Sequence, residues 1–178
     1  MVEPVESPPR WTYAVGGSRL RVSAGLLAWL TLAGVTLAAG AGRLAVGGTP
    51  ALLVACLVGS MLVHEGAHAW AAHRLGYRVQ WVVLGGLAGL TAYLGRDDRP
   101  LDRAAVALAG PAASAVAVVA LAAVRLTLPP GSGWADAVDL ALLVNALGCA
   151  VNLVPVGGTD GARAVRGLRQ HRRRTPVG

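Results

Sequence analysis

An apolar run that leads directly into a histidine-containing motif constrains the fold of this chain more than any other feature. The run covers residues 51–63, and His64-Glu65-Gly66-Ala67-His68 follows it without a break. Residues four apart on a helix are neighbours, so the two histidines share one face. Two imidazoles and a carboxylate are costly at membrane depth unless they have a function and a partner. The stretch therefore predicts a membrane helix that contains a functional polar site.

The H-E-x-x-H spacing is typical of a zinc site. His64 and His68 can supply two ligands of one tetrahedral Zn²⁺, with Glu65 between them as general base. A catalytic zinc needs a third protein ligand and leaves one position for water. The spacing predicts that this third ligand comes from another segment of the chain.

Four aspartates are near enough to the same predicted membrane face to be considered as the third ligand. Asp102 fits the N-cap of a helix, and Asp97 and Asp98 fit a solvated run between arginines. Asp160 ends an apolar span in which Pro155 breaks the helix, so its carboxylate can turn into a bundle. It can equally serve as a cap for the short segment that follows it.

The composition indicates a membrane protein with a single domain. Hydrophobic residues make up 54% of the 178 residues and charged residues 14%, with a mean hydropathy of +0.55, which is too apolar for an ordinary soluble domain. Four stretches approach the ~20 residues that cross a bilayer; they cover about 22–42, 51–73, 104–126 and 138–155. We expect an all-α polytopic membrane protein with about four transmembrane helices.

The segment between the second and third spans has a different pattern. Within residues 77–94, Val79, Trp81 and Val83 alternate with Gln80 and Val82, and Gly85-Gly86 is suited to a turn. The pattern fits a short β-hairpin or a re-entrant loop, and the alternation favours the hairpin.

The arginines predict the orientation in the membrane. All 16 basic residues are arginine, and they flank the apolar spans on one side far more than on the other. The positive-inside rule then puts both termini in the cytoplasm. The chain divides into a cytoplasmic N-terminal segment (1–21), a membrane-embedded domain (22–163) and a basic cytoplasmic tail (164–178). No basic face with interleaved aromatic residues is present, so nucleic acid is not an expected partner.

Two motifs together resemble a known family. His64-Glu65-x-x-His68 is followed, in a later span, by Asn152-x-x-Pro155-x-x-x-x-Asp160-Gly161. This order resembles the site-2 protease family of intramembrane zinc metalloproteases. Two shorter segments also resemble the family, Arg-Leu-Gly at 74–76 and Gly-Pro-Ala-Ala-Ser at 110–114.

The resemblance implies a zinc metalloendopeptidase that cleaves membrane-embedded or membrane-tethered proteins. It implies His64, His68 and Asp160 as zinc ligands and Glu65 as the catalytic base. Asn152 is a candidate for contacting the substrate or the oxyanion, and an interhelical hydrogen bond is an equally good interpretation. The expected location is a bacterial cell membrane, with the lipid bilayer and a membrane protein substrate as partners. The oligomeric state is not predicted.

Two other functions fit the same residues. A zinc-binding membrane transporter or sensor would use the same ligands without needing Glu65. An inactive homologue would act as a scaffold in a membrane complex, although the intact Glu65 disfavours this interpretation.

Overall fold

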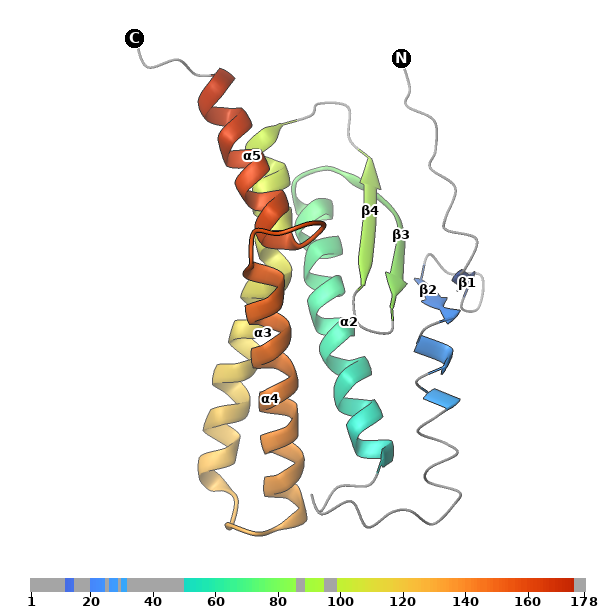
Figure 1. Cartoon of the computed structure of the whole chain (residues 1–178), viewed down its shortest axis with the longest axis vertical. Coiled ribbons are helices and arrows are strands. Elements are labelled where there is room, and N and C mark those ends of the chain that lie inside the picture. Colours follow the sequence, from blue (N-terminus) through green and yellow to red (C-terminus); the bar gives the residue numbers. More distant parts are fainter. Residues whose placement is uncertain are drawn as a thin grey trace.

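The structure is a computed structural model, and it describes residues 12–14, 20–24, 26–28, 30–31, 50–85, 89–94 and 99–174. Three long helices lie side by side, and a small sheet covers α2 on the side away from α3 and α4 (Figure 1). The helices are α2 (Pro50–Arg74), α3 (Pro100–Thr127), α4 (Gly133–Leu153) and α5 (Asp160–Arg174). The strands are β1 (Thr12–Ala14), β2 (Leu20–Ser23), β3 (Arg78–Leu84) and β4 (Leu90–Leu94).

Helices α3 and α4 form a pair that is suited to a bilayer. Pro100 starts α3, where a missing N–H costs nothing, and the Ser132 side chain caps α4 by accepting a hydrogen bond from the Ala135 amide. Both helices are long and apolar enough to cross a membrane, yet only 33% and 17% of their apolar stretches are buried within the molecule. Their outer faces therefore present apolar side chains, such as Val119 and Leu147, to the surroundings.

Helix α2 matches the predicted second span closely. Polar residues join it to α4, because Asn145 Nδ2 donates a hydrogen bond of 2.8 Å to Ser60 Oγ. A hydrogen bond of this kind stabilises the contact between two helices where no water competes for the same groups. Of the four predicted spans, the first lies largely outside the described residues, so the total of four remains a prediction.

The expected β-hairpin between α2 and α3 is confirmed. Strands β3 and β4 pair antiparallel, with one irregularity between Val79 and Trp81. The all-α prediction is too simple, however, because the sheet has four strands in the order β1-β2-β3-β4. Residues 20–23 form β2, parallel to β3, although the first predicted span began at residue 22. A strand this short, next to an apolar run, has no distinct pattern of its own.

The sheet order determines which strand has an open edge. Strand β3 is paired on both sides, and its Val83 is 1% exposed. Strand β4 is the last strand of the sheet and lies next to α2. Among the described strands, the edge of the sheet that lies beside the helices is therefore the outer edge of β4.

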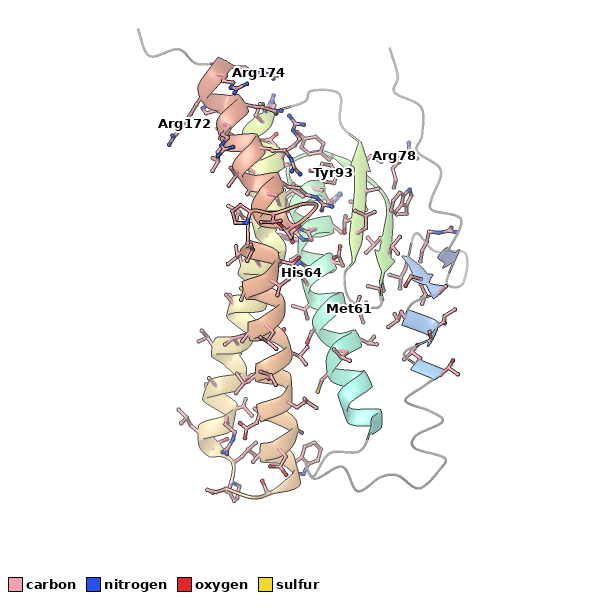
Figure 2. The ribbon with its side chains drawn as sticks, viewed as in Figure 1. Met61, His64, Arg78, Tyr93, Arg172 and Arg174 are labelled. Atoms are coloured by element: carbon pink, nitrogen blue, oxygen red, sulfur yellow. The ribbon has the colours of Figure 1, made fainter. Side chains whose placement is uncertain are left out.

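Helix α5 passes through the predicted boundary between the membrane domain and the basic tail at residue 163. It packs across the start of α3, where a β-carbon added at Gly167 would lie 2.5 Å from the Pro100 carbonyl oxygen and 3.1 Å from Ala104. Only glycine allows this close approach. Figure 2 shows Arg172 and Arg174 far along α5, away from His64 and beyond the ends of the long helices.

Candidate functional site

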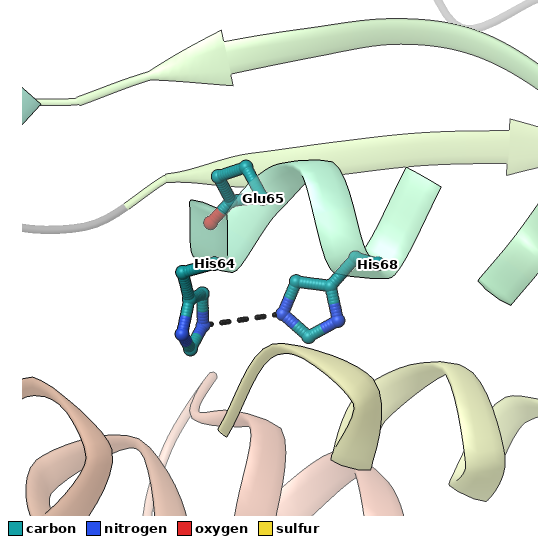
Figure 3. Close-up of side chains that lie close together, drawn as sticks. All are labelled: His64, Glu65 and His68. Atoms are coloured by element: carbon teal, nitrogen blue, oxygen red, sulfur yellow. Dashed lines mark hydrogen bonds between the residues drawn. The ribbon is translucent and has the colours of Figure 1, made fainter. Parts of the chain in front are cut away.

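Three polar side chains from two distant helices converge on one point. His64 and His68 project from α2, and Asp160 is the first residue of α5. The Asp160 Oδ2 atom lies 3.1 Å from His64 Nε2 and 3.2 Å from His68 Nε2. The two Nε2 atoms are 3.2 Å apart, as the dashed line in Figure 3 marks. All three residues are buried.

The chemistry of this donor set suits a bound cation. His68 Nδ1 lies 2.7 Å from the carbonyl oxygen of Val106, which can only accept, so Nδ1 carries the proton of a neutral imidazole. In the neutral ring, the lone pair on His68 Nε2 is then available to bind a cation beside the carboxylate oxygen. Ligands bound to zinc at ~2.0–2.1 Å in tetrahedral geometry lie about 3.3 Å apart, close to the distances here. Zinc is the cofactor that fits this site.

The start of α5 explains how Asp160 reaches the histidines. Helix α4 ends at Leu153, and the chain turns at Gly157, whose φ of 62° favours glycine. The Thr159 side chain then caps α5 by accepting a hydrogen bond from the Ala162 amide. Burial raises the pKa of the Asp160 carboxyl, but the two adjacent imidazoles lower it more, so the group is ionised. This is the form in which a carboxylate binds a metal.

Helix α3 orients the two histidines from the opposite side. Ser114 Oγ lies 3.0 Å from His64 Nδ1, and the Val106 carbonyl oxygen lies 2.7 Å from the corresponding Nδ1 atom of His68. Such partners set the tautomer and the ring orientation of a metal-binding histidine. At Gly110 the two helices meet so closely that an added β-carbon would overlap His68 Nε2 and lie 2.7 Å from His64 Nε2.

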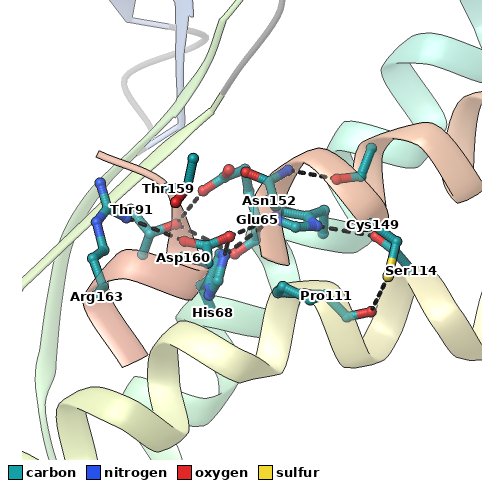
Figure 4. A network of polar contacts seen from close by, with 12 residues as sticks. Glu65, His68, Thr91, Pro111, Ser114, Cys149, Asn152, Thr159, Asp160 and Arg163 are labelled. Carbon is teal, nitrogen blue, oxygen red and sulfur yellow. Dashed lines mark hydrogen bonds and ion pairs between the residues drawn. The ribbon is translucent and has the colours of Figure 1, made fainter. Parts of the chain in front are cut away.

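Glu65 projects from the same turn of α2 toward the sheet. Thr91 on β4 donates a hydrogen bond of 2.8 Å to Glu65 Oε2, and a β-carbon at Gly89 would overlap the Glu65 side chain. Glu65 is 5% exposed, so the edge strand determines where its carboxylate lies. Figure 4 shows this network, with Glu65, Thr91 and Asp160 close together.

Comparison with known proteins finds one similar sequence and one similar fold. No family model matches the chain. It is 35% identical, over 132 residues or 68% of its length, to the protein named "Putative zinc metalloprotease Rip3" from the Erdman and H37Rv strains of Mycobacterium tuberculosis. The chain spans 34% of that protein's length. Its fold matches the site-2 protease from Methanocaldococcus jannaschii with a TM-score of 0.70 and 19% identity, covering 89% of this chain and 70% of the other.

The chain is thus similar in sequence to a protein named as a zinc metalloprotease, and it shares the fold of a site-2 protease. Both findings support the resemblance that the two sequence motifs indicate. The two long apolar helices α3 and α4, together with the site-2 protease fold, indicate a membrane protein.

The other candidate residues from the sequence are Asn152 and three aspartates. Asn152 Nδ2 donates to the carbonyl oxygen of Gly148 in its own helix, at 3.0 Å. Asp102 is not an N-cap, since α3 begins at Pro100, and it accepts a hydrogen bond from the Tyr77 hydroxyl. Asp97 and Asp98 lie outside the described residues.

Three residues near the site were missed by the sequence analysis of individual residues. Gly110 and Ser114 were noticed only as part of a family-like segment, and Thr91 was not noticed at all. A Gly-Pro pair inside an apolar helix was the available signal for close packing at Gly110. A single threonine in a strand, such as Thr91, has no sequence pattern that would indicate its contact with Glu65.

Proposed function

We propose that this chain is an intramembrane zinc metalloendopeptidase that cleaves membrane-embedded or membrane-tethered proteins. One observation supports this above all others: Glu65 is held beside a converging set of metal donors made by His64, His68 and Asp160. A transporter or sensor would need the donors but would have no use for the buried, positioned carboxylate. The sequence similarity to a zinc metalloprotease and the site-2 protease fold support this proposal.

In this mechanism each residue near the site has a distinct task. His64, His68 and Asp160 hold zinc, which when bound polarises water and the scissile carbonyl. Glu65 accepts a proton from the attacking water and passes it to the leaving amine. Thr91 keeps the Glu65 carboxylate turned toward the donors.

The sheet provides a surface on which an unwound substrate can bind. A transmembrane helix has no free backbone groups, so it must unwind before its peptide bond can be attacked. In the described part of the chain β4 pairs only with β3, and an extended chain can pair with the other edge of β4, beside Glu65, by strand addition. Asn152 stays a candidate for contacting the substrate, and its test is the loss of cleavage with normal zinc content in Asn152→Ala.

Replacing either His68 or Asp160 by alanine is expected to remove the bound zinc. Each change deletes one of three donors, and the two that remain bind zinc far more weakly. The measurement is the zinc content per purified chain. His73→Ala is the matched control, because His73 is exposed at the end of the same helix and should retain its full zinc. Full zinc in both site variants would contradict the ligand assignment.

Replacing Thr91 by valine should slow cleavage by about tenfold or more, while zinc content stays normal. Valine has the same shape but cannot donate to Glu65, and a hydrogen bond to a charged group contributes about 1.5–3 kcal/mol. Serine at this position retains the hydroxyl and should restore most of the rate. Measuring kcat and KM separately checks the role, because loss of positioning lowers kcat. A wild-type kcat in Thr91→Val would show that Thr91 is dispensable.

We further propose a multi-pass topology with both termini in the cytoplasm. The parallel pairing of β2 with β3 supports this topology. Two parallel strands must be joined by a crossover, and α2 is the part of that crossover that leads back to the sheet. Helix α5, with its arginines, lies at the opposite end of the bundle from the α3–α4 turn (Figure 1). The arginine-rich end is the cytoplasmic one by the positive-inside rule.

Reporter fusions can test this topology. A reporter after Gly178 should be active in the cytoplasm, and one inserted at Gly131 in the α3–α4 turn should be active outside it. An insertion at Gly95, in the connection between β4 and α3, should match the C-terminal fusion. Finding the reporters at Gly131 and Gly178 on one side would disprove the topology.

A further inference from the structure

A pocket of about 620 Å³ opens beside the metal-donor cluster, and one of its walls is basic. His68 lies at its inner end, and residues of β3 and β4 form one wall. The opposite wall comes from α3 and α5 and contains Arg103, Arg163 and Arg166. None of the described residues that line the pocket is an aspartate or a glutamate.

The arginines of this wall are held in place by neighbouring groups. Arg103 donates to the Gln170 side chain across the α3–α5 contact, and Arg166 donates to the Gly157 carbonyl at 3.4 Å. Arg163 Nη1 lies 3.4 Å from Asp160 Oδ1. A guanidinium has five N–H donors, so Arg163 and Arg166 can each donate to a ligand as well as to these groups. The carboxylate of Asp160 is already shared with two histidines, and the wall retains a net positive charge.

We infer that this pocket binds an acidic side chain of the substrate close to the bond that is cleaved. The inference rests on the proposed proteolytic function and specifies its substrate class. A guanidinium recognises a carboxylate by paired, charge-assisted hydrogen bonds, for which Arg163 and Arg166 lie on adjacent turns of α5. The pocket is the space between the open strand and these arginines.

The geometry also limits where in the substrate the acidic residue lies. A chain paired with the edge of β4 is extended, and every second side chain points to the same face. Successive residues advance about 3.3 Å, and the pocket contains both His68 and the arginines. The acidic residue is therefore within a few positions of the scissile bond, on one side of it.

Binding to an inactive form of the whole protein tests this inference directly. The chain with Glu65→Gln is loaded with zinc in phosphatidylcholine nanodiscs, so that a peptide binds without being cleaved. The probes are transmembrane peptides of one sequence, in which a single Glu is moved through successive positions, with Gln and Lys versions of each. We expect Glu at one or two positions to bind about tenfold more tightly than Gln, and Lys to bind more weakly.

Two charge reversals on α5 separate the pocket from the general basicity of the helix. Arg166→Glu should abolish the preference for Glu peptides and favour the Lys versions at the same positions. Arg172→Glu makes the same change in charge on the same helix, at an exposed residue outside the pocket, and should keep the preference. Equal binding of Glu and Gln peptides at every position would overturn the inference. Equal effects of the two reversals would overturn it as well.

Lipid competition and a cleavage assay complete the test of the pocket. If phosphatidylglycerol in the nanodiscs removes the Glu preference of the otherwise unchanged Glu65→Gln protein, the pocket binds lipid headgroups and the inference fails. The active chain is assayed with the same peptides for zinc-dependent cleavage. Cleavage without any Glu preference defeats the pocket alone, whereas selective binding without cleavage by the active chain defeats the proposed protease.

Discussion

Replacing Glu65 by glutamine is expected to abolish cleavage while zinc content remains at the level of the unchanged protein. Glutamine has nearly the same size and can still contact Thr91, but it cannot accept a proton from water. Loss of a general base typically lowers a rate by about 10²–10⁴-fold, so no product should be detectable in a standard assay. The paired measurements are zinc per chain and the rate of cleavage of a membrane-embedded substrate.

A matched acid-to-amide change serves as the control for Glu65→Gln. Asp139 is exposed at the α3–α4 end of the bundle, where it pairs with Arg125 at 2.8 Å. Asp139→Asn should leave both zinc and cleavage unchanged, since exposed ion pairs contribute little. Cleavage by Glu65→Gln at the normal rate would rule out the mechanism, and zinc transport by this variant at the normal rate would favour the transporter.

Replacing Gly110 by alanine is expected to remove zinc altogether. The added methyl group would overlap His68 Nε2 and press on His64 Nε2, the atoms that must meet the metal. Helix α3 cannot retreat freely, because Val106 and Ser114 contact the same two histidines. One methyl group at this position should therefore have the effect of deleting a ligand.

The same substitution elsewhere provides the comparison for Gly110→Ala. A β-carbon at Gly148 in α4 would meet nothing within 4 Å. Alanine is the better helix former by about 1 kcal/mol, so Gly148→Ala should fold normally and retain zinc. Circular dichroism and size-exclusion chromatography of both variants show whether Gly110→Ala is folded. A folded, fully zinc-loaded Gly110→Ala protein would contradict the described approach of α3.

The pair of histidines in the candidate metal site was the easiest part to predict from sequence. The spacing of His64 and His68 on a helix is local, so it follows from helix geometry alone. Asp160 was one of four aspartates considered from the residues themselves, and the family resemblance singled it out. Its approach to the histidines depends on Pro155 and on the turn at Gly157, whose presence was visible but whose direction was not.

The parts that escaped prediction depend on contacts between segments far apart in the chain. Thr91 reaches Glu65 only because β4 is the last strand of the sheet and runs along α2. The pairing of β2 with β3 joins residues 20–22 to residues 82–84 through a crossover that no local pattern specifies. The alternation in β3, by contrast, is a local pattern, and it correctly indicated the hairpin.

The distance along the chain between the donors has a consequence for biosynthesis. His64 and Asp160 are 96 residues apart, and Asp160 belongs to the last helix of the described structure. During translation α2 enters the membrane long before α5 leaves the ribosome. With Asp160 as a ligand, the site cannot bind zinc tightly until α4 has been inserted and α5 has folded back across α3. Until then the nascent protein lacks a complete metal site, so it is inert toward neighbouring membrane proteins while α2, α3 and α4 are being inserted.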